Sequence, residues 1–146
     1  MSRTKILIID DDHHILLMVK KMLERAGFEV DLASNGNEGL ELFQKMQADL
    51  VITDIIMPEK EGLETIREMK RLRSDLKIIA MSGGGKISAD NYLETAKIFG
   101  ANLVLEKPFS QKTMVDAVNT LMGGSSENDM AAGNGAAGPG LEKEKG

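Results

Sequence analysis

The sequence of 146 residues predicts an α/β domain, in which a parallel β-sheet is covered by helices on both faces. Three observations lead to this prediction. Short aliphatic runs, partly β-branched, alternate with longer amphipathic segments along the chain. The aliphatic runs are nearly continuous, which is typical of parallel strands buried on both faces. Two of them stop abruptly at carboxylates, at the end of a strand where open α/β sheets bind their ligands.

Strands and helices are expected in strict alternation. The strands are predicted near Lys5–Ile9, Glu29–Leu32, Leu50–Thr53, Lys77–Met81 and Asn102–Leu105. The helices are predicted near His13–Ala26, Gly36–Gln47, Gly62–Leu72, Ala89–Phe99 and Gln111–Met122. Gly27 and Gly100 lie where helix C-caps are expected. Asp12 and Ser110 each precede a helix and can cap its N-terminus.

The first helix has apolar residues at the spacing i, i+3, i+4 and i+7, and this stripe is expected to face the sheet. The stripe consists of Ile15, Met18, Val19, Met22 and Ala26. At about 100° per residue, Leu17 falls nearly opposite the stripe and Leu16 falls on its margin. Leu17 is therefore expected to be exposed to solvent.

Composition separates a folded domain, residues 1–122, from a C-terminal tail, residues 123–146. The tail is mostly Gly, Ala, Asn, Ser and charged residues, so it is predicted to be a flexible low-complexity segment. The chain has no cysteine, which removes disulfides and thiolate chemistry and is compatible with the cytoplasm. A net charge of −5 without a basic, aromatic stripe argues against nucleic-acid binding, and no apolar run is long enough for a membrane.

Carboxylates at two strand ends predict a metal site. Asp10 and Asp11 follow the first strand, and Asp54 follows the third. If these strands are neighbours, the three side chains converge. Like charges about 4 Å apart repel by roughly 4 kcal/mol at an effective dielectric constant near 20, so a cation is expected among them. Oxygen ligands of this kind suit a hard divalent ion such as Mg²⁺.

Two further side chains at strand ends predict phosphate chemistry beside the metal. Ser82 follows the fourth strand and Lys107 the fifth. Asp54 could act as a nucleophile that accepts a phosphoryl group. The metal and Lys107 would neutralise charge on that group, and the Ser82 hydroxyl would donate a hydrogen bond to one of its oxygens. Each of these features is weak evidence alone. Together, the acids Asp10 and Asp11, the acceptor Asp54, the hydroxyl of Ser82 and the ammonium of Lys107, at four strand ends, are specific for a site of this kind.

The sequence resembles the receiver domain of bacterial two-component response regulators over about Lys5 to Met122. The matching stretches are Ile6-Leu-Ile-Ile-Asp10-Asp11, Val51-Ile-Thr-Asp-Ile-Ile-Met-Pro58 with Gly62, Ile79-Ala-Met-Ser-Gly83, Gly100-Ala101 and Lys107-Pro108-Phe109. The resemblance implies a flavodoxin-like, doubly wound sheet of five parallel strands in the order 2-1-3-4-5. Because the tail is too short and polar to form a DNA-binding domain, a stand-alone, single-domain regulator without substrate turnover of its own is expected.

The same resemblance implies that Asp54 is phosphorylated by a sensor histidine kinase or a histidine phosphotransfer protein, and that a downstream protein reads the change. The Mg²⁺ ligands would be Asp11, Asp54, the backbone carbonyl of Ile56 and waters, with Asp10 acting mostly through water. The Lys107–Pro108 bond would be cis. Members of this family also bind histidine-bearing helices through their first helix. The resemblance therefore implies that the exposed Leu17 contacts such a helix.

One position departs from the family. Many members carry Tyr or Phe three residues before the lysine as a rotameric switch, and this chain has Val104. The conformational change is therefore expected in the Gly83–Lys86 loop and the fourth helix. The main alternative function is a pseudo-receiver, an interaction module that works without phosphorylation. A dehalogenase-like phosphatase is disfavoured because His14 stands where Thr or Val is needed, and a flavodoxin because acids replace its phosphate loop.

Overall fold

The computed structural model describes residues 3–55, 61–83, 94, 97 and 100–123. By its internal contacts the chain forms two compact units, residues 1–115 and 116–146. The first unit contains the whole sheet, and helix α5 (Gln111–Leu121) crosses the boundary between the units. The predicted tail begins at residue 123 and lies almost entirely outside the described residues, so its flexibility stays a prediction.

Five parallel strands form one sheet in the order β2-β1-β3-β4-β5, which confirms the predicted fold class. The strands are β1 (Lys5–Ile9), β2 (Glu29–Ala33), β3 (Leu50–Asp54), β4 (Lys77–Gly83) and β5 (Leu103–Lys107). The chain passes from β1 to β2 on one side of it, and then crosses to β3 on the other side of β1. The strand order therefore reverses between β1 and β3. Open α/β sheets bind ligands at such a reversal, outside the carboxyl ends of the two strands.

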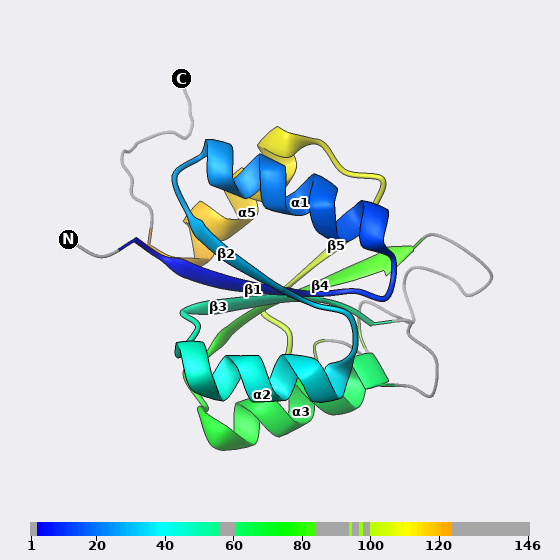
Figure 1. Ribbon diagram of the computed structural model, residues 1–146, viewed down its shortest axis with the longest axis vertical. Coiled ribbons are helices and arrows are strands. Elements are labelled where there is room, and N and C mark those ends of the chain that lie inside the picture. Colours follow the sequence, from blue (N-terminus) through cyan, green and yellow to red (C-terminus); the bar gives the residue numbers. More distant parts are fainter. Residues whose placement is uncertain (1–2, 56–60, 84–93, 95–96, 98–99, 124–146) are drawn as a thin grey trace. The chain divides into compact units, whose positions relative to one another are not determined.

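The helices of the first unit cover both faces of this sheet (Figure 1). Helix α1 (His13–Arg25) lies on one face, and α2 (Gly36–Met46) and α3 (Glu61–Leu72) lie on the other. Of the helix expected at Ala89–Phe99, only Glu94 and Lys97 are among the described residues, and both are helical. None of the described helices is long and apolar enough to cross a membrane.

The central strands are buried on both faces, which explains why their sequences are apolar without alternation. Every residue from Ile6 to Ile9 and from Leu50 to Ile52 is fully buried. Side chains from α2 and α3 pack on the same core, including Phe43, Ile66 and Met69. The carboxyl ends of β1 and β3 are therefore supported by a closely packed interior.

Strands β4 and β5 run two residues beyond their predicted ends. Ser82 pairs with Glu106 and Gly83 pairs with Lys107, so these polar residues belong to the ladder and do not follow it. The physical reason is that backbone hydrogen bonds continue regardless of side-chain polarity. Strand β3 likewise continues to Asp54, which pairs with Met81. Three predicted site residues are thus fixed by sheet pairing.

The predicted face of α1 is wrong by about one residue position. Leu16, Val19 and Leu23 are the buried residues of this helix, whereas Met18 is 37% exposed and Ala26 is exposed. The unbroken apolar run from Ile15 to Val19 permits either phase, and the observed one buries two leucines against the sheet. Leu17 is 54% exposed, as predicted.

Helix ends follow the predicted signals. The Asp12 carboxylate accepts hydrogen bonds from the backbone N–H groups of His14 at 2.9 Å and Ile15 at 3.4 Å, which caps α1. Gly27 follows the C-cap of α1 with φ of 97°, a conformation that favours glycine. The Ser110 hydroxyl accepts from the N–H of Thr113 at 3.1 Å at the start of α5.

Candidate functional site

Three carboxylates meet at the carboxyl ends of β1 and β3. Ile9 pairs with Thr53 across these strands, so the residues that follow, Asp10 and Asp54, are neighbours. Both are buried, whereas Asp11 is exposed. One carboxylate oxygen from each of the three residues lies within 4.8 Å of the others. The structure therefore brings together the three acids that the sequence placed at two separate strand ends.

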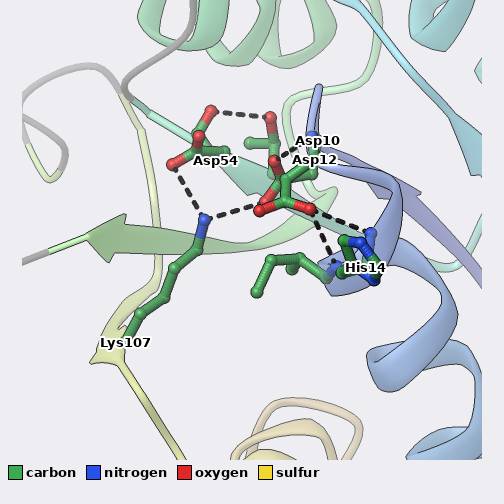
Figure 2. A network of polar contacts seen from close by, with 7 residues as sticks. Asp10, Asp12, His14, Asp54 and Lys107 are labelled. Atoms are coloured by element: carbon green, nitrogen blue, oxygen red, sulfur yellow. Dashed lines mark hydrogen bonds and ion pairs between the residues drawn. The ribbon is translucent and has the colours of Figure 1, made fainter.

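The ammonium group of Lys107 reaches this cluster from the end of β5. Its Nζ lies 2.9 Å from Oδ2 of Asp10 and 3.7 Å from Oδ1 of Asp54. Figure 2 shows the lysine side chain extended between the two carboxylates. The single positive charge of Lys107 offsets no more than one of the three negative charges, so the cluster favours a further cation. The Lys107–Pro108 bond is cis, as the resemblance implied.

The carboxylate of Asp10 is fixed at both oxygens. Its Oδ2 accepts from Lys107, and its Oδ1 accepts from the backbone N–H of Asp12 at 2.9 Å. Because Asp12 in turn caps α1, the start of that helix and the orientation of Asp10 are linked (Figure 2). Asp10 is thus a rigid, buried member of the cluster, and Asp11 is its exposed member.

The structure describes some of the remaining predicted site residues and not others. Ser82 is buried on β4, one residue beyond Met81, the ladder partner of Asp54. Ile56, whose carbonyl is a predicted metal ligand, lies outside the described residues, so that role stays a prediction. Val104 lies on β5 opposite Ala80 and packs, partly buried, against the core. The Gly83–Lys86 loop beyond Gly83 is also outside the described residues.

The donor set fits a hard divalent cation. It consists of oxygen atoms from Asp10, Asp11 and Asp54, it carries a negative charge that Lys107 offsets only in part, and it combines two buried ligands with an exposed one. Mg²⁺ prefers such carboxylate oxygens and retains several waters, which the exposed side of the cluster allows. These three residues would hold the ion.

Among the described residues, two groups away from the cluster have displaced pKa values. Hydrogen bonds from the backbone N–H and the hydroxyl of Ser34 lower the pKa of the Glu38 carboxyl at the start of α2. Burial, with a smaller effect of Lys77, lowers the pKa of the Lys70 ammonium at the end of α3. Lys70 donates to the carbonyl of Leu76 at 2.5 Å, at the opposite end of β4 from Ser82.

Known proteins are similar to this chain in sequence and in fold. The chain is 34% identical to the chemotaxis protein CheY of Thermotoga maritima over 116 residues, which cover 79% of this chain and 94% of the relative. It is 30% identical to the sporulation initiation phosphotransferase F of Bacillus subtilis over 118 residues, covering 81% and 93% of the two chains. A crystal structure of a response regulator receiver domain protein from Clostridium thermocellum has a TM-score of 0.75 and 35% identity, covering 82% and 94%.

The family comparison agrees with these relatives. The family described as the response regulator receiver domain matches residues 6–119, which include the carboxylate cluster, Ser82 and Lys107. The sheet order, the cluster at the ends of β1 and β3 and the lysine from β5 are all within that match. The chain therefore belongs to the family of response regulator receiver domains of two-component systems.

Proposed function

We propose that this receiver domain accepts a phosphoryl group on Asp54 from the phosphohistidine of a sensor histidine kinase or a histidine phosphotransfer protein. The observation that carries the proposal is the placement of Asp54, a buried carboxylate whose Oδ1 lies 3.7 Å from the Lys107 ammonium and within a cluster of two other carboxylates. A buried nucleophile beside a fixed cation can stabilise the charge of a transferring phosphoryl group.

In the proposed step, a carboxylate oxygen of Asp54 attacks phosphorus while the bond from phosphorus to the donor imidazole nitrogen breaks. The electron pair of that bond stays on the imidazole, and the product on this chain is an acyl phosphate. Lys107 donates to a phosphoryl oxygen, which requires that its ammonium shift from Asp10 toward Asp54. Ser82 is proposed to donate its hydroxyl hydrogen bond to another oxygen.

Asp10, Asp11 and Asp54 are the proposed ligands of Mg²⁺, together with the carbonyl of Ile56. When bound, the ion would neutralise negative charge on the phosphoryl oxygens and on the carboxylates around them. Side chains of the protein perform the other proposed roles. Asp10 holds Lys107 close to the site, and Asp54 provides the nucleophilic oxygen.

The partners are proposed to be signalling proteins in the cytoplasm. The relative from Bacillus subtilis is named a sporulation initiation phosphotransferase, which supports transfer of a phosphoryl group between proteins. Leu17 and Met18 expose apolar surface in the first turns of α1, and we propose that they contact the helix that carries the donor histidine. A downstream protein would then recognise the phosphorylated form, and no independent substrate turnover is expected.

Intact-protein mass spectrometry tests the proposal. The parent protein, incubated with acetyl phosphate and Mg²⁺, should gain the mass of one phosphoryl group, and Asp54→Asn should gain none. Asp31→Asn is the matched control, since Asp31 is an exposed aspartate on the edge strand β2 and should leave labelling unchanged. Equal labelling of the parent and Asp54→Asn would contradict the proposed acceptor. An unlabelled parent that its cognate kinase also fails to label would favour a pseudo-receiver.

A further inference from the structure

Gly62, in the first turn of α3, lies directly against the peptide bond that joins Asp54 to Ile55. A Cβ atom at Gly62 would collide with the carbonyl oxygen of Asp54 and would lie 2.7 Å from Cα and 2.9 Å from the carbonyl carbon of Ile55. All three are backbone atoms, so no side-chain rotation could relieve the collision. Any side chain here must displace either α3 or the peptide that follows the proposed phosphoryl acceptor.

The same peptide is held from two other directions. The hydroxyl of Thr53 donates to the carbonyl oxygen of Asp54 at 3.1 Å, and Thr53 is fully buried. On the opposite side, the N–H of Ile55 donates to the carbonyl of Met81 on β4 at 3.1 Å. The Asp54–Ile55 peptide is therefore fixed by the sheet, by a buried hydroxyl and by the close approach of α3.

The position of the Asp54 carboxylate depends on this peptide, because the side chain and the peptide share the Asp54 Cα atom. We infer that Gly62 and Thr53 are positioning residues for phosphoryl transfer, which hold the Asp54–Ile55 peptide so that the carboxylate faces Lys107 and the incoming phosphorus. The inference rests on the proposed function of Asp54. At position 62 a side chain is excluded by contact with backbone atoms of Asp54 and Ile55 and not by an unusual backbone angle. The position therefore requires the small size of glycine.

Gly39 provides a matched control in α2. It is also a buried helical glycine, and a Cβ atom there would collide with Cδ1 of Ile9 and lie 2.9 Å from its Cγ1. These atoms belong to the side chain of Ile9 and not to the backbone, so Gly39→Ala must shift a side chain, whereas Gly62→Ala must shift backbone atoms. Replacement of either glycine by alanine raises helix propensity equally, so the two variants differ mainly in whether the acceptor's own backbone must move.

The experiment measures labelling of the folded parent, Gly62→Ala and Gly39→Ala by acetyl phosphate at saturating Mg²⁺. In this reaction the Asp54 oxygen bonds to phosphorus as the bond from phosphorus to the acetyl oxygen breaks and acetate leaves. The limiting rate should fall by about tenfold or more for Gly62→Ala, as small misplacements of a reacting group do. Gly39→Ala should keep the parental rate. Saturating Mg²⁺ is required because Asp54 is also a proposed ligand of the ion, so its displacement in Gly62→Ala would weaken metal binding as well as slow the transfer.

A parental limiting rate in folded Gly62→Ala, or an equal loss in both alanine variants, would overturn the positioning role. If Gly62→Ala does not fold, Thr53→Val decides, because it removes only the hydroxyl that holds the same carbonyl and keeps the side-chain shape. A slower limiting rate at saturating Mg²⁺ is expected, and a parental rate would overturn the inference. An unlabelled parent would instead overturn the proposed function, and the positioning role with it.

Discussion

Lys107 Nζ donates a hydrogen bond of 2.9 Å to Oδ2 of Asp10, joining residues that are 97 positions apart in the sequence. The pair joins the end of the edge strand β5 to the end of the interior strand β1. The Asp10 side chain is 1% exposed and that of Lys107 is 19% exposed, so water screens the pair poorly. Within the part of the chain that the structure describes, Lys107 is the cationic partner of Asp10, and the buried carboxylate depends on it for stability when no metal is bound.

Replacement of Lys107 by Met should therefore destabilise the metal-free protein. It leaves the buried Asp10 carboxylate without its counter-ion, and loss of one partner of a buried pair costs about 3 kcal/mol. Urea unfolding in the presence of EDTA would measure the change in the free energy of unfolding.

The control for that experiment is the double variant Lys107→Met with Asp10→Asn. Removal of the uncompensated charge should recover much of the lost stability, because residues in contact are energetically coupled. An unfolding midpoint equal to the parent's in Lys107→Met alone would show that the pair does not stabilise the fold.

Mg²⁺ should stabilise the folded protein. The carboxylate oxygens of Asp10, Asp11 and Asp54 converge only in the folded state, so an ion that binds them adds about 2.7 kcal/mol at one hundred times its dissociation constant. Thermal unfolding at increasing Mg²⁺ would measure this. Asp11→Asn should be at least as stable as the parent without metal, because repulsion is relieved, and should respond little to the ion. A melting temperature that does not change up to tens of millimolar Mg²⁺ would argue against the site.

The phase of α1 can be tested with two adjacent leucines. Leu16 is 3% exposed, so Leu16→Ala should lower the free energy of unfolding by about 2–5 kcal/mol through loss of buried contacts. Leu17 is 54% exposed, so Leu17→Ala should change it by no more than roughly 0.5 kcal/mol. Chemical denaturation of the two variants makes the comparison, and similar losses in both would contradict the observed packing.

The same Leu17→Ala variant tests the docking surface on α1. Transfer from the cognate histidine protein should become slower, whereas labelling by acetyl phosphate should stay at the parental rate, because a small donor needs no helix contact. Glu24→Ala, also exposed on α1, is a control for a change at the helix surface without loss of apolar area. Unchanged transfer in Leu17→Ala would remove the docking role.

The Glu38 carboxylate should stabilise the fold only above acidic pH. Its pKa in the folded protein lies below the ordinary value of 4.5, because Ser34 donates two hydrogen bonds to it. The stability it adds is therefore present above pH 4.5 and is lost as the pH falls through the lower, folded value. Glu38→Gln should be less stable than the parent near neutral pH, by less than about 1 kcal/mol at this exposed site. Denaturation at decreasing pH should find the two proteins converging, and a constant difference would refute the assignment.

The sheet and its ligand edge could be predicted from the sequence, because buried parallel strands leave continuous apolar runs that end at polar residues. Asp10, Asp11 and Asp54 were placed together on this basis. The phase of α1 could not be predicted, since the unbroken run from Ile15 to Val19 satisfies two stripes and only contact with the sheet selects between them.

Other parts of the site depend on three-dimensional contacts that a single sequence does not encode. The position of Lys107 in the sequence does not indicate that its ammonium lies nearer to the Asp10 carboxylate than to the Asp54 carboxylate. Gly62 was part of the matching motif, but the backbone collision that excludes a side chain appears only in the folded chain. The cap at α2 was missed although Asn35 and Glu38 have the spacing of a capping pair.

The central claim is that Asp54 becomes an acyl phosphate, and borohydride reduction tests it most directly. Borohydride converts an aspartyl phosphate to homoserine, which peptide mass spectrometry can assign to a position in the chain. After incubation with acetyl phosphate and Mg²⁺, homoserine is expected at position 54, and the yield should fall sharply when EDTA replaces Mg²⁺. Homoserine at another aspartate, such as Asp10 or Asp11, or its absence from a protein that carries the phosphoryl mass, would contradict the account.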